Sequence, residues 1–378
     1  MGSPQDRRPR VLIAGGGIAG VEALLALRVV AGPGPSIELF STGPDLAYRP
    51  LRVTEPFGLG EMERFPLADI AADQHAAFRL DALTSVDGPA RRVRLRGGEW
   101  LSYDALVMAT GATAHNAVPG ATLFHGRGGT NDLAAALDSA RQGRIGRLAF
   151  AVPAGVSWPL PLYELALLSA WRLAEDGVSG VAISFVTPER EPLELFGAEA
   201  GRAVRALFAE REVELLVGTV PAQAGGGRLE LAEGGHVPAD ATFTVPRLEG
   251  RRTIGLPAGP DGFIPVDAHG RVSGLEDVYV VGDGADYPVK QGGLATQQAD
   301  AAAEAIAARL GLHDEPQPFR PVLRATLLTG SAPLYLSASL CDDETPPEVA
   351  ERPSWPEPGK VAGRHLGPYL AELERWTG

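Results

Sequence analysis

The fold of the N-terminal part of the chain follows from the residues Val11-Leu12-Ile13-Ala14-Gly15-Gly16-Gly17-Ile18-Ala19-Gly20. A short apolar run followed by glycines is typical of a buried parallel strand that ends in a tight turn. The residues of 19–30 favour a helix, and Ala31-Gly32-Pro33-Gly34-Pro35 ends it. Because Ile37-Glu38-Leu39-Phe40 reads as the next strand, the segment predicts a βαβ unit.

Gly15, Gly17 and Gly20 have the GxGxxG spacing of a dinucleotide-binding turn. Such glycines allow the tight turn, the close approach of a pyrophosphate to the backbone and the close packing of helix on strand. Ile18 and Ala19 then begin the helix, where unpaired N–H groups and the helix dipole face the phosphates. We therefore expect these five residues to bind a dinucleotide; a purely structural glycine turn is the alternative.

The residue that usually binds the ribose of the dinucleotide differs in this chain. Ser41 ends the second expected strand, at the position where Asp or Glu is usual. A hydroxyl can bond a ribose oxygen, but without the charge-assisted contact that a carboxylate makes. Arg49 lies a few residues further on and can add a contact on the adenosine side; a plain surface charge is the alternative.

Two later segments complete a set of three motifs. Tyr103-Asp104-Ala105-Leu106-Val107-Met108-Ala109-Thr110-Gly111 is the second, and Val280-Val281-Gly282-Asp283 is the third. In this order the motifs resemble the two-dinucleotide-fold flavoproteins, relatives of the pyridine nucleotide-disulfide reductases. The resemblance covers roughly residues 9–315 and is strongest to the branch of type II NADH dehydrogenase, sulfide:quinone oxidoreductase and flavocytochrome c sulfide dehydrogenase.

The resemblance implies FAD as the cofactor and assigns residues to it. Ala109, Thr110 and Gly111 would pass under the cofactor, and Asp283, after Gly282, would accept a hydrogen bond from the ribitol chain; a turn carboxylate is the alternative for Asp283. The segment with Lys290, Gln291 and Gly292 leads into a helix from Leu294 and would face the pyrimidine edge of the flavin. A cation or a helix dipole there stabilises reduced flavin. We therefore assign Lys290 a catalytic role, with a surface lysine as the alternative.

The second nucleotide site departs from the family pattern. After the expected strand at 148–152 the chain has Pro153-Ala154-Gly155-Val156-Ser157-Trp158-Pro159-Leu160-Pro161 instead of a second GxGxxG. Prolines remove N–H donors and Cβ atoms block a close approach, so the loop argues against standard NAD(P)H binding.

Trp158 stands where the resembled sulfide dehydrogenases carry a redox cysteine, either as core packing or as a pocket wall. Glu164 matches their glutamate near the flavin and could relay a proton; a first-turn glutamate favouring the helix dipole is the alternative.

Composition excludes several classes of function. The net charge of the 378 residues is −13, which argues against a nucleic-acid partner and against docking to an anionic membrane. Cys341 is the single cysteine, so an intramolecular disulfide and a CxxC redox pair are excluded, in keeping with a cytoplasmic location. The seven histidines lie in separate segments, so we expect no metal site.

Together these features predict an α/β fold with a doubly wound, Rossmann-like FAD-binding domain. Residues 1–115 and 254–316 would form that domain, 116–253 an inserted, degenerate NAD(P)-binding-like α/β domain, and 317–378 a C-terminal cap. The expected function is an FAD-dependent oxidoreductase that exchanges hydride or electrons with a small organic substrate or quinone. An NAD(P)H dehydrogenase with a non-standard nicotinamide site, and a flavin-binding partner protein with little turnover, are the alternatives. A homo-oligomer is compatible with the sequence.

Overall fold

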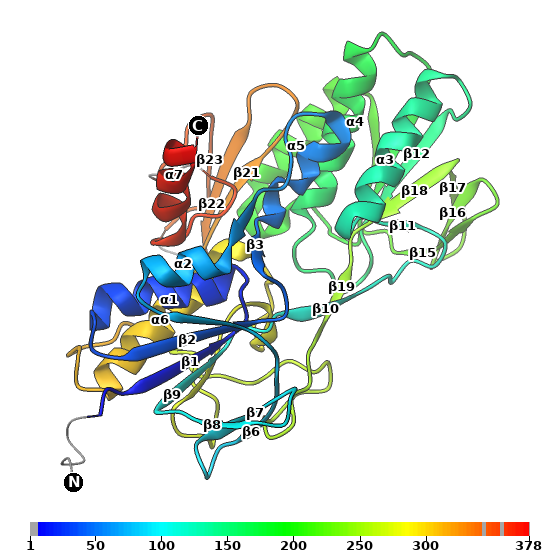
Figure 1. Ribbon diagram of the computed structural model, residues 1–378. Coiled ribbons are helices and arrows are strands. Elements are labelled where there is room, and N and C mark those ends of the chain that lie inside the picture. The colour runs from blue at the N-terminus through cyan, green and yellow to red at the C-terminus, as the bar shows by residue number, and fades with distance from the viewer. Residues whose placement is uncertain (1–6, 342–344, 356–358, 378) are drawn as a thin grey trace.

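The computed structural model describes residues 7–341, 345–355 and 359–377, and within them five parallel strands form the first sheet (Figure 1). Their order is β20 (Val278–Val280), β9 (Ala105–Met108), β1 (Arg10–Ala14), β2 (Ser36–Ser41) and β5 (Ala77–Leu80). The chain runs from β1 outward to β2 and β5 and then returns to the other side of β1, so the strand order reverses between β1 and β9. Doubly wound sheets bind ligands at the carboxyl ends of the strands beside such a reversal.

Two helices cover one face of this sheet, and a small antiparallel sheet covers the other (Figure 1). α1 (Ile18–Ala31) and α6 (Gly292–Arg309) pack against each other, and both are rich in buried alanine and leucine. The helix expected from Leu294 begins two residues earlier, because the side chain of Gln291 caps it by accepting the Leu294 N–H at 2.8 Å. The predicted βαβ unit is present as β1, α1 and β2, because β1 and β2 pair in parallel.

The opposite face corrects one reading of the sequence. The short strands between residues 76 and 108 look like a single antiparallel excursion, yet β5 and β9 belong to the parallel sheet. Only β6 (Leu83–Asp87), β7 (Arg92–Leu95) and β8 (Trp100–Ser102) are antiparallel. All four residues of β9 are buried, as both faces of a central strand require.

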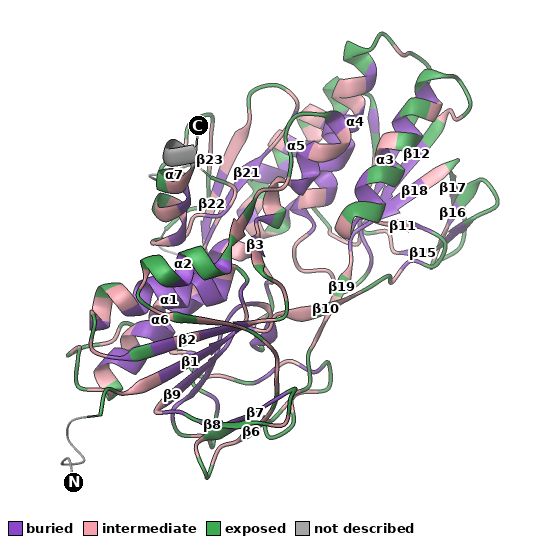
Figure 2. Ribbon diagram, in the orientation of Figure 1, coloured by how far each residue is buried: buried purple, intermediate pink, exposed green. Residues whose placement is uncertain are grey.

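A second parallel sheet has the order β11 (Thr122–Leu123), β18 (Ala241–Thr244), β12 (Arg147–Ala151), β13 (Ala182–Val186) and β14 (Val213–Leu216). The helices α3 (Gly126–Arg141), α4 (Leu160–Glu175) and α5 (Gly197–Glu210) pack on one side of it. The meander β15 (Pro221–Gly225), β16 (Arg228–Leu231) and β17 (His236–Pro238) packs on the other side. Figure 2 shows both sheets buried between their layers. The α/β fold class is thus confirmed.

Two connections join the units that contain these sheets. One is the antiparallel pair β10 (Ala112–His115) and β19 (Arg247–Gly250) at the waist of the molecule (Figure 1). The other is the C-terminal part of the chain. Its sheet β21 (Val322–Leu327), β22 (Leu334–Ser339) and β23 (Glu348–Ala350) packs into the core of the second unit, while α7 (Leu366–Thr377) packs on α1. The division at 1–115, 116–253, 254–316 and 317–378 stays a prediction. The remaining elements β3 (Asp45–Ala47), β4 (Arg64–Pro66) and α2 (Leu67–Asp73) lie beside the first sheet.

The start of α7 is anchored by a carboxylate from α1. Glu22 is fully buried and accepts the backbone N–H groups of His365, at 2.9 Å, and Leu366, at 2.6 Å. It thereby caps the first turn of α7 from a distant part of the chain. Asp300 of α6 lies beside it, 3.7 Å from Nε2 of His365, and ligand-type atoms of all three side chains lie within 4.8 Å of one another. The absence of metal stays a prediction, and no local pattern in the sequence indicates that His365 lies beside two carboxyl groups.

This anchor predicts a pH-dependent attachment of α7. Burial, and then the charge of Glu22, raise the pKa of Asp300 to about 8, with Glu304 acting in the same direction and Arg364 in the opposite one. Because that pKa is raised on folding, the stabilisation is complete below the ordinary value of 3.8 and is lost as the pH rises through about 8. We expect the opening equilibrium of α7, measured by hydrogen exchange, to increase about tenfold between pH 8 and pH 9. Asp300→Asn is expected to remove this dependence, and an equal pH response in both proteins contradicts the assignment.

Candidate functional site

A cavity of about 1650 Å³ lies at the carboxyl ends of β1 and β9 and extends to the second unit. It collects nearly all the residues predicted from the three motifs and from the 153–164 loop. Those that line it are Gly15, Gly17, Ile18, Ala19, Ser41, Arg49, Ala109, Thr110, Gly111, Glu164, Gly282, Asp283, Lys290, Gln291 and Gly292. Gly20 is the exception among the predicted residues, because it packs behind the turn.

The glycines of the first turn have different tasks. Gly15 has φ +127°, and a Cβ there would lie 2.1 Å from the carbonyl oxygen of Ala109. A Cβ on Gly20 would lie 1.7 Å from the carbonyl oxygen of Gly15. Gly17 has an ordinary φ of −88°, and nothing lies within 4 Å of its Cβ position. Gly15 and Gly20 therefore let the turn pack, whereas the bare backbone of Gly17 faces open cavity, as a pyrophosphate site requires.

Ser41, at the end of β2, and Arg49, at the start of a 3₁₀ segment, also line the cavity. The Ser41 hydroxyl accepts the N–H of Gly43 at 3.2 Å and lies beside Gly16. It can still donate its own proton to a ribose oxygen. Arg49 is exposed on the 3₁₀ segment Arg49–Phe57, and its charge lowers the pKa of Asp283. Arg49 lines the same cavity as Asp283.

Lys290 and Asp283 face the same part of the cavity. Lys290 donates to the carbonyl oxygen of Ala285 at 2.5 Å, and its ammonium lies 3.7 Å from the centre of the Phe263 ring. Burial lowers the pKa of Lys290 to about 8, although Asp283 and Asp286 oppose the shift. Burial raises the pKa of Asp283, against the charges of Lys290 and Arg49. The ammonium of Lys290 therefore lies in the cavity wall, where the effect of burial on its pKa exceeds that of Asp283 and Asp286.

Glu164 forms a buried ion pair that the sequence did not reveal. Its side chain is 1% exposed and accepts hydrogen bonds from the ammonium of Lys360 and from the N–H of Leu328 at 2.9 Å. Lys360 also donates to the carbonyl oxygen of Thr326 at 2.8 Å, and it lines the cavity. Burial raises the pKa of Glu164 and Lys360 opposes the shift. The first-turn alternative for Glu164 is wrong, because α4 begins at Leu160 and no acidic residue lies in its first turn. The one signal for Lys360 was the scarcity of lysine, since Lys290 is the only other.

In the second parallel sheet, neighbouring side chains bond the carboxylate that follows β13. Tyr163 is fully buried and donates to Oε2 of Glu189 at 2.6 Å, and the Thr187 hydroxyl donates to the same oxygen at 2.9 Å. Burial raises the pKa of Glu189, against both hydrogen bonds. Glu189 follows β13, where a nucleotide-binding sheet presents its acidic ribose ligand. Trp158 packs edge-on against Phe196, with the ring centres 6.0 Å apart, and also lines the main cavity.

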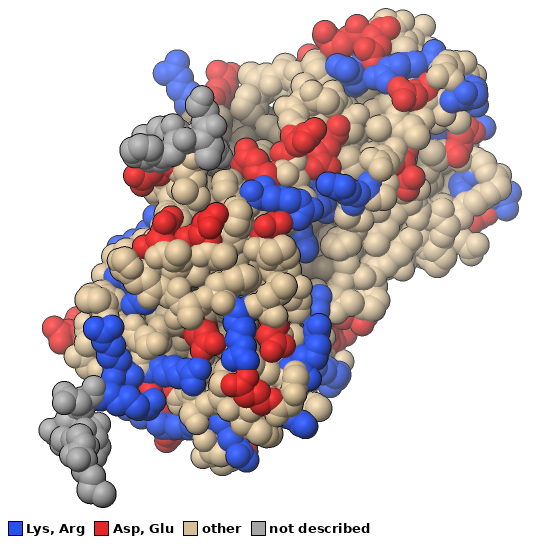
Figure 3. All heavy atoms as spheres, viewed as in Figure 1, with Lys and Arg blue, Asp and Glu red and all other residues tan. Residues whose placement is uncertain are grey.

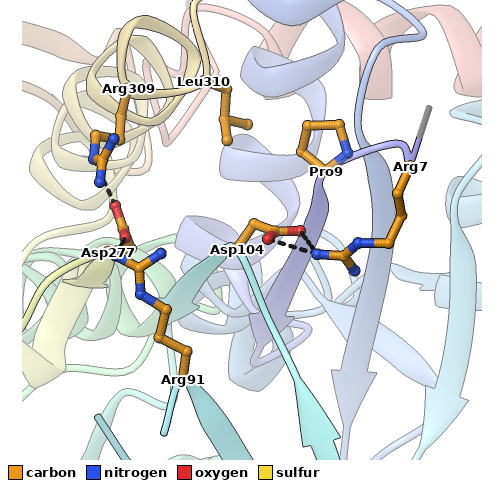
Figure 4. A pocket seen from close by; sticks show the side chains of 7 residues that line it. All are labelled: Arg7, Pro9, Arg91, Asp104, Asp277, Arg309 and Leu310. Atoms are coloured by element: carbon orange, nitrogen blue, oxygen red, sulfur yellow. Dashed lines mark hydrogen bonds and ion pairs between the residues drawn. The ribbon is translucent and has the colours of Figure 1, made fainter. Parts of the chain in front are cut away.

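A smaller pocket of about 250 Å³ lies at the opposite edge of the first sheet (Figure 4). Its charges are already paired: Arg7 bonds Asp104 at 2.7 Å, and Asp277 holds both Arg91 and Arg309. Asp104 and Asp277 directly precede β9 and β20, so these ion pairs fix the amino ends of the strands. The large cavity is therefore the candidate site.

Two observations bear on the excluded classes. Cys341 is exposed and does not line the large cavity. Among the helices in the described part of the chain, none has the length and the apolar character needed to cross a membrane.

Comparisons with known proteins agree with this architecture. The family model for pyridine nucleotide-disulphide oxidoreductase matches residues 166–306. The ferredoxin reductase component of chlorobenzene dioxygenase from Cupriavidus sp. (strain PS12) is 29% identical over 329 residues, which cover 80% of this chain and 75% of that protein. Sulfide-quinone reductase from Aquifex aeolicus (strain VF5) is 27% identical over 267 residues, 65% of this chain and 60% of the relative.

A solved structure gives the same fold. The sulfide:quinone oxidoreductase of Aquifex aeolicus superimposes with a TM-score of 0.82 at 21% identity, over 97% of this chain and 90% of that one. Its strand and helix arrangement is therefore shared nearly throughout. The chain is therefore similar in sequence to the pyridine nucleotide-disulphide oxidoreductase family over residues 166–306, and it shares its fold with sulfide:quinone oxidoreductase.

Proposed function

We propose that this protein is an FAD-dependent oxidoreductase whose flavin exchanges electrons directly with a small organic substrate or a quinone, without redox cysteines. The observation that carries the proposal is the convergence of three distant motifs on one cavity, with the backbone of Gly17 bare where a pyrophosphate would approach. The prolines of the 153–164 loop, which remove N–H donors, support the proposal that the second unit does not bind NAD(P)H in the standard way. The relatives include a sulfide-quinone reductase and a ferredoxin reductase component, which act on different acceptors.

The residues present fit FAD. Gly15, Gly17 and the amino end of α1 would hold the pyrophosphate, and Asp283 would accept from the ribitol chain. When bound, FAD would supply hydride or single-electron transfer. Lys290 and the amino end of α6 would then supply positive charge that stabilises the reduced ring system. Glu164, held by Lys360 in the cavity wall, is the group able to keep or release a proton beside the substrate.

The role of Lys290 gives a direct prediction. Lys290→Ala is expected to lower the midpoint potential of the bound flavin, because the reduced anion loses a nearby cation worth on the order of 1 kcal/mol. The ammonium of the wild type deprotonates above its pKa of about 8, so the difference between the two proteins is expected to shrink above that pH. Spectroelectrochemical titration at several pH values measures both effects. An unchanged potential at pH 7 removes Lys290 from the site.

Anaerobic spectroscopy tests the proposal itself. We expect the purified protein to show flavin absorption, or to acquire it when FAD is added, and to be reduced slowly or not at all by NADH and NADPH. Prompt bleaching by either nucleotide favours an NAD(P)H dehydrogenase with a non-standard site. Flavin bands that resist nucleotide, quinone and dithionite alike favour a binding protein with little turnover. A protein that neither contains nor takes up FAD refutes all three functions.

A further inference from the structure

The chain holds its two lysines in opposite ways. Lys360 is paired with the buried carboxylate of Glu164, which cancels most of its charge. Lys290 makes no ion pair within the described residues. Its ammonium donates to the carbonyl oxygen of Ala285 at 2.5 Å and lies 3.7 Å from the centre of the Phe263 ring. Because both of these partners are uncharged, the charge of Lys290 is left to act on the cavity that this residue lines.

The other charges around the cavity are of both signs. Arg49 and Arg64 line it, and so do Asp45 and Asp81. In Figure 3 acidic and basic side chains both lie beside the hollow at the waist of the molecule. Opposite charges that lie close together largely cancel at a distance. A flavin in the cavity would therefore respond to the individual charges closest to its ring, and the groups that fix those charges become important.

A bridge between two segments fixes both partners of the Lys290 ammonium. Ile264 and Ala285 form an isolated parallel bridge. The N–H of Ile264 donates to the carbonyl oxygen of Gly284 at 3.0 Å, and the N–H of Asp286 donates to the carbonyl oxygen of Ile264 at 2.8 Å. Phe263 directly precedes this bridge and Ala285 is part of it, so the ring and the carbonyl group are held on one piece of paired backbone.

The turn that leads into Phe263 is packed against the end of β19. The N–H of Gly250, the last residue of that strand, donates to the carbonyl oxygen of Asp261 at 2.8 Å. A Cβ on Gly262 would lie 2.3 Å from the carbonyl oxygen of Gly250, so the two backbones are in close contact. The backbone of Phe263 is therefore fixed on both sides, by this turn and by the bridge that follows.

Core packing does not account for a phenylalanine at this position. Phe263 is half-buried and belongs to none of the hydrophobic clusters that the described residues form. The face of an aromatic ring attracts a cation through its quadrupole, and this attraction is strongest where water is excluded. Unlike a carboxylate, the ring has no net charge, so it fixes a cation without cancelling the field of that cation at a distance.

We propose that Phe263 is a positioning residue that holds the ammonium of Lys290 against its ring face and thereby helps to set the potential of the flavin. Phe263 is not among the residues that line the cavity, so it acts through Lys290 and does not touch cofactor or substrate. The inference rests on the proposed function, because it concerns the cation that we assign to the reduced flavin.

The two lysines allow a first test that needs no cofactor. Isotope labelling of lysine alone gives side-chain NMR signals from Lys290 and Lys360 only. Phe263→Leu keeps an apolar contact but removes the ring, so we expect the apoprotein to bind the Lys290 proton about tenfold more weakly, with a pKa of about 7 in place of about 8. Asp283 and Asp286, the charged groups that raise this pKa, are unchanged in the variant.

Three comparisons accompany this titration. Phe263→Trp keeps a ring and is expected to titrate like the wild type. The Lys360 signal is the internal reference, because its ion pair lies elsewhere in the cavity wall. Phe319→Leu is the matched control: Phe319 is also half-buried but packs edge-on against Tyr287, with the ring centres 5.3 Å apart, and its loss is expected to leave Lys290 unchanged. Should Phe263→Leu fail to fold, Phe263→Met removes the ring in the same way.

Spectroelectrochemical titration of the FAD-loaded protein measures the consequence for the flavin. At pH 8 the wild-type Lys290 is about half protonated and that of Phe263→Leu about one-tenth, so the variant is expected to have the lower midpoint potential. The effect of Lys290→Ala, which shrinks above about pH 8 in the wild type, is expected to shrink above about pH 7 in the Phe263→Leu background.

Several outcomes overturn the assignment. An unchanged titration of Lys290 in Phe263→Leu shows that the ring does not hold the ammonium. An equal effect of Phe263→Leu and Phe263→Trp gives the residue a merely structural role. A Lys290 titration that moves as expected, with an unchanged flavin potential, overturns the link to the flavin. A protein that never takes up FAD refutes the proposed function and that link together, whereas the apoprotein titration still decides whether Phe263 positions Lys290.

Discussion

Lys360→Met is expected to lower the free energy of unfolding by about 3–5 kcal/mol, because it leaves the carboxylate of Glu164 buried without its cation. The remaining hydrogen bond, from the N–H of Leu328, does not replace a full charge. Denaturant titration measures the effect as a lower midpoint at constant slope. Since burial raises the pKa of Glu164, the loss is expected to be smallest below its ordinary value of 4.5, where both states bind the proton, and largest above the folded pKa.

The double variant Glu164→Gln/Lys360→Met shows whether the stability lost in Lys360→Met comes from an unpaired buried charge or from lost packing. Both substitutions keep the volume of the side chain and remove both charges, so most of the stability is expected to return. A double variant as unstable as Lys360→Met would mean that packing around Lys360, and not the ion pair, stabilises this wall of the cavity. The pH dependence of the rate of flavin reduction is then compared between this double variant and the wild type. If Glu164 transfers a proton, the dependence changes; if Glu164 has only a structural role, it stays the same.

Gly20→Ala is the second substitution with a large expected effect. Its Cβ would lie 1.7 Å from the carbonyl oxygen of Gly15, which is backbone and cannot turn away. α1 would have to move off β1, and we expect a loss of about 3 kcal/mol of stability together with the capacity to bind FAD. Thermal unfolding of the apoprotein measures the first effect, and flavin absorbance after dialysis against FAD measures the second.

Gly17→Ala is the matched control for that substitution. Nothing lies within 4 Å of the new Cβ and the backbone conformation is ordinary, so the apoprotein is expected to keep its stability to within about 0.5 kcal/mol. Its methyl group would occupy the surface that we assign to the pyrophosphate, so FAD affinity is expected to fall. Unfolding of Gly17→Ala, or retention of FAD by both variants, contradicts the division of tasks within the turn.

The sequence predicted those parts of the site that depend on neighbouring residues. The strand-turn-helix around Gly15 follows from local patterning, and Asp283 and Lys290 lie in segments with recognisable motifs. Periodicity does not distinguish a short buried parallel strand from an antiparallel one, so it does not show that β5 and β9 belong to the parallel sheet. Pairing partners are set by topology, and β9 joins β1 only because the chain returns across the sheet.

Contacts between distant segments escaped prediction for a physical reason. Glu164 and Lys360 lie far apart in sequence, as do Glu22 and His365, and neither pair has a local pattern. In the second unit, Tyr163 of α4 donates a hydrogen bond to Glu189, which follows β13. Prolines in the 153–164 loop argue against a nucleotide there, but they do not show that Tyr163 donates a hydrogen bond to Glu189.

The C-terminal part of the chain has a mechanical consequence. Leu323, Leu327 and Leu336 lie in the core of the second unit, while Val361 and Leu366 lie in the core of the first. The strand pair β10–β19 alone would let the two units rotate about the waist. The C-terminal part of the chain is a second connection between the units and restricts that rotation. We therefore expect the molecule to behave as a rigid frame that unfolds in one transition and admits its substrate through an aperture of fixed width.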